Sequence, residues 1–121
     1  MLTGMFTAGG GIDTNLEVGV EKAVGTITIN GTTYTRYVKI VDCGALPNAT
    51  GKQVSHGITY TGVEAIYGTA INTSNLTSIP LPYTSPSNAI GIYITSSIIQ
   101  INTVSDLRTY NKSYVTIEYY R

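Results

Sequence analysis

The dipeptide Asn30-Gly31, set between two alternating runs, most restricts what this chain can fold into. Residues 24–29 before it and residues 32–41 after it alternate β-branched or aromatic side chains with polar ones, as strands do. Asn-Gly between such runs favours a type I′ turn, because both central residues of that turn need a positive φ angle. The sequence therefore predicts an antiparallel hairpin over residues 24–41.

The second strand of this hairpin carries polar and apolar residues on both faces. Alternation gives one face Tyr34, Arg36, Val38 and Ile40, and the other face Thr35, Tyr37, Lys39 and Val41. Mixed faces with a tyrosine and a base on each side are typical of a sheet edge or a subunit boundary. We therefore expect this strand at such a position.

Residues 42–58, DCGALPNATGKQVSHGI, predict a corner between two halves of one β domain. Pro47 fixes its own φ angle and Gly44 permits positive values, so residues 44–48 favour a turn. A short alternating run over residues 52–56 follows, and it predicts a strand in the second half.

Other short runs extend the all-β pattern along the chain, and nowhere do apolar residues recur at helical spacing over more than a turn. The strands expected from them are residues 12–22, through Leu16, Val18 and Val20; an interior strand over 63–71, with a bulge at Gly68; an incompletely paired segment at 79–83; a hairpin over 90–104; and a closing strand at 113–120. This pattern predicts an antiparallel β-sandwich of the jelly-roll-like kind.

The charge content excludes one class of function and favours assembly. Charged residues make up 12% of the chain, against about 25% in an average soluble domain. The formal net charge is zero and no cluster of Lys or Arg is present, which excludes nucleic-acid binding. Because net charge opposes association, we expect oligomers.

Cysteine and histidine occur once each, as Cys43 and His56, which restricts metal and catalytic chemistry. A single cysteine forms no intrachain disulfide, and we interpret Cys43 as an inert thiol. One His and one Cys do not supply the three or four ligands of a zinc site, so we expect no metal site within one chain and no cofactor, although a trimer axis could collect three copies of one side chain. No run approaches the roughly 20 apolar residues of a membrane span, so we expect no membrane insertion.

Catalysis by this chain would have to use His56 or a pair of carboxylates. A serine-type triad would need Asp42, Glu64 or Asp106 to orient the histidine. We instead interpret His56 as structural. The carboxylates are few and dispersed, so a glycoside hydrolase is the weakest of the functions considered. We expect no enzymatic activity.

Residues 1–11, MLTGMFTAGGG, have two interpretations. They form a disordered tail, or they form a docking arm in which Leu2, Met5 and Phe6 bind a partner and residues 9–11 act as a hinge. We divide the chain into an N-terminal arm at 1–23 and a β domain at 24–121.

Five segments, in this order, carry a family resemblance: VGT leading to NG at 24–31, GALPNATGKQVSHGI at 44–58, IYGTA at 66–70, SIPLPY at 78–83 and YNKSYVTIEYY at 110–120. With them the chain resembles the C-terminal β-sandwich domain of tail and head fibre proteins of tailed bacteriophages. It departs from that family at Ile27 and Ile29, where an aromatic residue is usual, and only about two dozen residues precede the matched part, so we expect no stalk.

The resemblance implies a homotrimeric structural protein of the virion, assembled in the host cytoplasm. It would act as a fibre tip or surface knob in host attachment, with itself, other virion proteins and a host cell-surface glycan as partners. Without a stalk, the knob would attach through its surface or through Leu2, Met5 and Phe6.

A carbohydrate-binding module without a virion role is the alternative. In either case the receptor contacts would come from residues in or beside loops, namely Tyr83, Asp106, Arg108 and Tyr110. Each tyrosine also has an interpretation as a strand residue packed against its neighbours.

Overall fold

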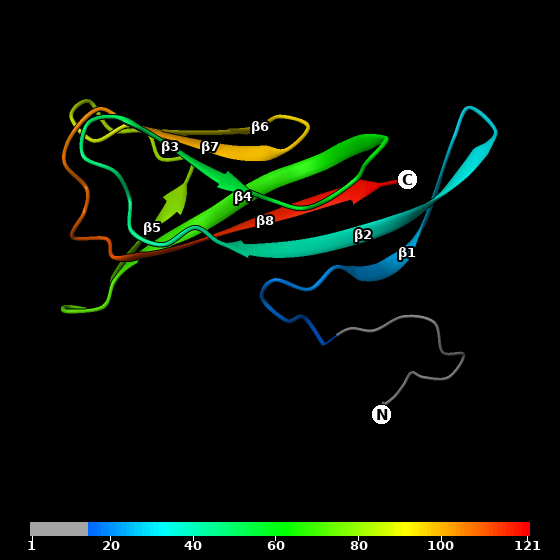
Figure 1. Ribbon diagram of the computed structural model, residues 1–121, viewed down its shortest axis with the longest axis horizontal. Coiled ribbons are helices and arrows are strands. Elements are labelled where there is room, and N and C mark those ends of the chain that lie inside the picture. Colours follow the sequence, from blue (N-terminus) through cyan, green and yellow to red (C-terminus); the bar gives the residue numbers. More distant parts are fainter. Residues whose placement is uncertain (1–14) are drawn as a thin grey trace.

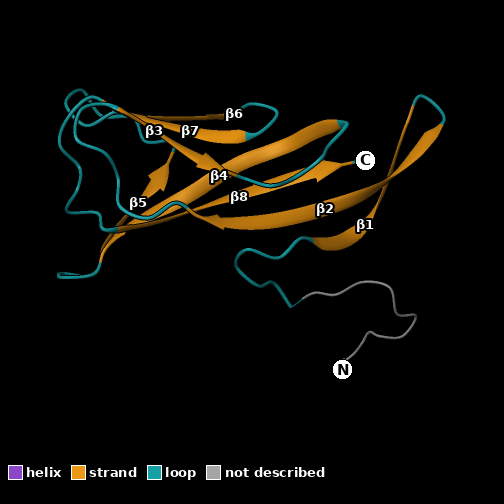
Figure 2. Cartoon of the chain, viewed as in Figure 1, coloured by secondary structure: helices purple, strands orange, loops and turns teal. Residues whose placement is uncertain are grey.

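The computed structural model describes residues 15–121 (Figure 1). The arm residues Leu2, Met5 and Phe6 therefore lie outside the described residues, as do residues 9–11. Strands and loops account for all of the described chain, which contains no helix (Figure 2).

Eight strands make up two antiparallel sheets. The strands are β1 (Lys22–Ile29), β2 (Thr32–Asp42), β3 (Gly51–Ser55), β4 (Gly62–Asn72), β5 (Thr77–Leu81), β6 (Ile90–Ile94), β7 (Ile98–Thr103) and β8 (Lys112–Tyr120). Five of them form one sheet in the order β1-β2-β8-β4-β5, and three form the other in the order β3-β7-β6. Figure 1 shows the three-stranded sheet lying over one face of the larger sheet. The expected all-β, two-sheet architecture is confirmed.

The core lies between the two sheets. Val115, Ile117 and Tyr119 of β8 are fully buried on the inner face of the five-stranded sheet, and Ile99 and Ile101 of β7 are fully buried opposite them. Alternation along β8 leaves the residues between these three on the other face, as the period of a strand requires. We call that face, which turns away from the three-stranded sheet, the outer face.

The predicted first hairpin is confirmed, including its turn. Asn30 has a φ angle of 49° and Gly31 one of 83°, so both central residues adopt the positive values of a type I′ turn. Thr28 and Thr33 face each other next to this turn, and their hydroxyl oxygens lie 2.8 Å apart. The second hairpin, β6–β7, and the closing strand β8 also lie where the sequence placed them.

The predicted corner at residues 42–58 is confirmed as the passage from the larger sheet to the smaller one. Gly44 has a φ angle of 69°, and its amide donates to the carboxylate of Asp42 at 2.9 Å. Leu46 is buried, and Lys52 donates from Nζ to the carbonyl oxygen of Ala45 at 2.8 Å. β3 then begins the second sheet at Gly51.

The strand predicted over residues 12–22 is wrong in its described part. Residues 15–21 form a turn in which Val20 donates to the carbonyl of Glu17, at 3.1 Å. Gly19 has a φ angle of 84°, which breaks the extended path, and its amide donates to the carbonyl of Ile40 at 2.7 Å. Residues 12–14 lie outside the described part.

Two details of the sheet also differ from expectation. β2 is not an edge strand, because it pairs with β1 on one side and β8 on the other. β4 is an interior strand, as predicted, but its register shifts between Val63 and Ala65 and not at Gly68. A Cβ at Gly68 would overlap the carbonyl oxygen of Tyr114, so glycine here permits the close approach of β8.

Candidate interaction surface

The outer face of the five-stranded sheet carries a groove of about 400 Å³. Its lining comes from the N-terminal turn and from β1, β2, β4 and β8, and consists of Leu16, Val24, Arg36, Tyr37, Val38, Tyr67, Thr116 and Glu118. Leu16 is 49% exposed and Tyr67 is 44% exposed. Exposed apolar surface gathered at one concave place marks an interaction site more often than scattered apolar residues do.

Two bulges help to shape this groove. The register of β1 against β2 shifts at Val24, and that of β4 against β8 shifts at Glu64. A bulge adds one residue to one strand and re-aims a side chain. In this way Val24 lines the groove, and Glu64 reaches Arg36 of β2 across the intervening strand β8.

The ionisable side chains of the groove already have partners within the chain. Arg36 donates to both carboxylate oxygens of Glu64, at 2.9 and 3.0 Å, and this pairing raises the pKa of Arg36. The hydroxyl of Tyr67 donates to the carboxylate of Glu118 at 2.6 Å, which raises the pKa of Tyr67. The groove therefore favours an uncharged, apolar occupant over an ion.

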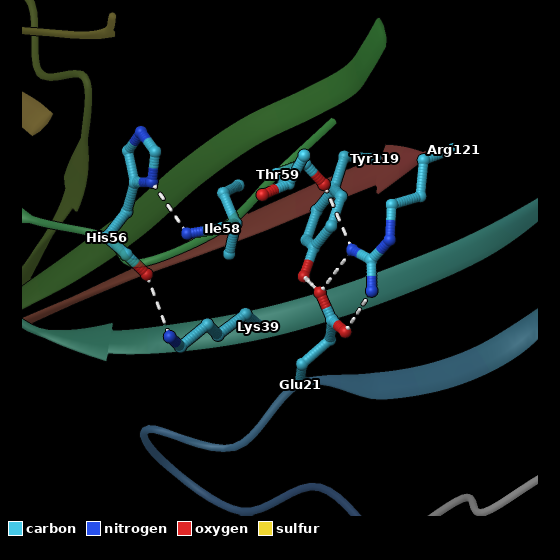
Figure 3. Close-up of polar contacts among 7 residues, drawn as sticks. All are labelled: Glu21, Lys39, His56, Ile58, Thr59, Tyr119 and Arg121. Atoms are coloured by element: carbon cyan, nitrogen blue, oxygen red, sulfur yellow. Dashed lines mark hydrogen bonds and ion pairs between the residues drawn. The ribbon is translucent and has the colours of Figure 1, made fainter. Parts of the chain in front are cut away.

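A second polar cluster joins the N-terminal turn to the end of β8 (Figure 3). Arg121 donates to both carboxylate oxygens of Glu21, each at 2.8 Å, and to the carbonyl of Thr59 at 3.0 Å. The buried Tyr119 hydroxyl donates to the same carboxylate. The guanidinium group lies 4.2 Å from the centre of the Tyr37 ring, so the cluster also contains a cation–π contact.

The histidine considered for catalysis is buried and bonded to backbone groups (Figure 3). Nδ1 of His56 accepts from the amide of Ile58 at 3.1 Å, so the proton of a neutral ring is on Nε2, which lies 2.8 Å from the carbonyl oxygen of Thr95. The backbone carbonyl of His56 accepts from Lys39 at 2.8 Å. These contacts support the structural interpretation.

The three carboxylates considered as its orienters bind elsewhere. Asp42 accepts from Gly44, Glu64 from Arg36, and Asp106 from Arg108. Cys43 is also buried, and burial raises the pKa of its thiol to about 11. A thiol with such a pKa is not a nucleophile at neutral pH.

The structure places the predicted receptor-contact residues in two loops. Asp106, Arg108 and Tyr110 follow β7, whereas Tyr83 follows β5. Arg108 donates to both carboxylate oxygens of Asp106, at 2.8 and 2.7 Å, and lowers the pKa of that carboxyl to about 2. Tyr83 and Tyr110 are half-buried against the core.

A hydrogen bond of 2.8 Å between Ser105 and Asn88 links these two loops. They lie together at one end of the molecule, the left end in Figure 1. Asp106 and Arg108 are exposed in these loops. Their role as receptor contacts stays a prediction.

Sequence reasoning missed the groove. It assigned Tyr34, Arg36, Val38 and Ile40 correctly to one face of β2, but it did not identify Tyr67, Leu16 or Glu118 as their neighbours. The usable signal was the mixed composition of that face, which places the apolar Val38 beside Arg36.

Within residues 15–121, no helix is long and apolar enough to cross a membrane. The same residues contain no group of three or more His, Cys, Asp or Glu side chains that could hold a metal ion. No protein-family model, curated protein or solved structure matches this chain.

Proposed function

We propose that this protein is a structural component of a bacteriophage virion, a homotrimeric knob or fibre tip with a jelly-roll-like sandwich that mediates or assists attachment to the host. The observation that carries the assembly part of this proposal is the apolar groove on the outer face of a sheet, in a chain of zero net charge, and the virion part is supported by the sequence resemblance. Such a face serves assembly, because burying it in a partner removes apolar surface from water.

The composition of the outer face supports a subunit contact. Interfaces are enriched in tyrosine and arginine relative to the remaining surface. Here the rings of Tyr34 and Tyr120 pack against each other in a tilted arrangement, with 5.0 Å between ring centres, and Tyr67 and Arg36 lie in the groove. The linked loops with Asp106 and Arg108 are at one end of the sandwich, away from this face, and would remain available to contact a host glycan.

The oligomeric state tests the assembly part of the proposal. Sedimentation equilibrium of the isolated protein should give about three times the chain mass of 12.9 kDa. Tyr67→Lys should shift the protein to monomer, because it places a charge in the contact. Tyr93→Lys is the matched control, since Tyr93 is 51% exposed but lies on β6 of the other sheet.

A wild-type protein that stays monomeric at micromolar concentration would contradict the trimer. The virion part is tested by mass spectrometry and cryo-electron microscopy of purified phage particles. Both should detect the protein on the particle surface, and its absence from particles would contradict a virion role.

A carbohydrate-binding module is the second candidate, and Tyr67 is the observation that favours it. Its half-exposed ring lies beside the polar groups of Arg36, Thr116 and Glu118, and sugars bind to an aromatic face flanked by polar groups. Glycan-array binding by a protein that is absent from virions would favour this candidate. Release of reducing sugar from host polysaccharide would instead indicate a glycoside hydrolase.

A further inference from the structure

The first residues that the structure describes lie at the groove on the outer face. Asn15 is the first described residue, and the next residue, Leu16, already forms part of the groove lining. The segment before Asn15 therefore starts at the rim of the groove. It is 14 residues long.

The chemistry of this segment matches that of the groove. Residues 1–12 contain no charged side chain, and their apolar members are Met1, Leu2, Met5, Phe6, Ala8 and Ile12. The groove is lined by Leu16, Val24, Val38 and Tyr67, while its ionisable side chains are paired with one another or with Glu64. An uncharged apolar occupant leaves those pairs intact and loses no solvated charge on binding.

The length of the segment is also sufficient. Phe6 precedes Leu16 by ten residues, which span at most about 36 Å when extended. Residues 9–11 are three glycines, so the chain can reverse direction between Phe6 and Leu16. A tether this short gives the segment an effective concentration of the order of millimolar at its own groove, far above that of other copies in a micromolar solution.

We propose that residues 2–12 fold back on the same chain, and that Met5 and Phe6 occupy the groove on the outer face. The segment acts as an intramolecular cover for apolar surface that the two sheets leave open. In the assembly proposed above, a neighbouring copy would meet this covered face. The cover itself does not depend on the trimer, since it forms within one chain.

A single introduced indole tests the proposal, because the chain has no tryptophan. The variant Phe6→Trp should show blue-shifted emission and several-fold weaker quenching by iodide than the same protein in urea. Thr116→Arg, added to that variant, should restore quenching, since Thr116 lines the groove. Thr69→Arg is the matched control, because Thr69 is exposed on the same face but outside the lining.

Circular dichroism and thermal melting establish that each variant is folded. If Thr116→Arg unfolds the protein, Tyr67→Ala takes its place, since it removes one wall of the groove at a half-exposed position. An indole that is quenched in the folded protein as readily as in urea would overturn the proposal. Shielding that survives Thr116→Arg would also overturn it, because the indole would then lie elsewhere.

The failure of this inference can be told apart from the failure of the proposed function. Sedimentation of the same samples reports the oligomeric state, whereas emission reports the environment of residue 6. Shielding that persists after dilution to monomer supports a cover within one chain. Shielding that disappears on dilution would overturn it, because the segment would then come from another copy.

Discussion

Glu21 is held by two residues far along the chain, Tyr119 and Arg121. The hydrogen bonds from Arg121, followed by those from Tyr119, lower the pKa of Glu21 below its ordinary value of 4.5. A carboxyl whose folded pKa is lowered stabilises the fold above its unfolded pKa, and this contribution is lost as the pH falls through the folded pKa. The cluster therefore stabilises the native state at neutral pH and not in acid.

We expect Glu21→Gln to lower the free energy of unfolding by about 0.5–1 kcal/mol at neutral pH, because the carboxylate is partly exposed. The difference between wild type and variant should be constant between about pH 6 and 8 and should shrink below about pH 4.5. Urea denaturation at a series of pH values measures it. A difference that stays constant down to about pH 3 would show that the charge of Glu21 contributes nothing.

His56 is expected to contribute to stability and not to chemistry. Its ring is buried and bonded to Ile58 and Thr95, so His56→Ala leaves a cavity and an unpaired Ile58 amide, while the Thr95 carbonyl keeps its bond from Tyr60. We expect a loss of about 2–4 kcal/mol, measured by thermal or urea unfolding. Loss of host adsorption or of any hydrolytic activity from a folded His56→Ala protein would contradict a structural role.

At the scale of elements, the turn of the first hairpin is determined by backbone conformation. A Cβ at Gly31 would meet no atom within 4 Å, so Gly31→Val is costly only because φ is 83°. We expect a loss of about 1–3 kcal/mol in the free energy of unfolding. Gly91→Val is the control, since Gly91 also has open space but lies in β6 without a positive φ. Equal melting temperatures for the two variants would contradict the type I′ turn.

Gly68 tests the contact between β4 and β8. Because a side chain there would overlap the backbone of Tyr114, Gly68→Ala must push the two strands apart. The expected cost is about 1–3 kcal/mol, as for overpacking in a core. Gly91→Ala has no such neighbour and should be nearly neutral when the two are compared by urea denaturation. Equal free energies of unfolding for the two variants would contradict the close approach of β4 and β8 at Gly68.

What could be predicted from the sequence was the local part of the fold. Both hairpins and β8 follow from alternation and from turn residues that lie next to each other in the chain. The turn at residues 15–21 could not be predicted, because it depends on a hydrogen bond from Gly19 to Ile40 in another element. The groove could not be predicted either, since Leu16, Val38, Tyr67 and Thr116 meet only once β8 lies between β2 and β4.

At the scale of the whole molecule, charge is balanced and locally paired. The net charge is zero, and three arginines are paired within the described chain with Glu64, Asp106 and Glu21. An interface built from such a surface gains little from long-range attraction. Its stability should depend on buried apolar area.

The proposed trimer should therefore respond weakly to salt. Between about 0.05 and 0.5 M sodium chloride, its dissociation constant should change by less than about threefold. Sedimentation at several concentrations in each salt gives this constant. Weakening by about tenfold or more would indicate charged contacts between subunits and would contradict an interface centred on the apolar groove.

The place of β8 in the larger sheet has a consequence for how the protein is made. β8 leaves the ribosome after the other seven described strands, yet it lies between β2 and β4 and joins them. Until it is synthesised, the β1–β2 hairpin and the β4–β5 hairpin lack the strand that connects them. The sheet can be completed only after translation has passed residue 120, and a nascent chain held before residue 112 should remain open to proteases.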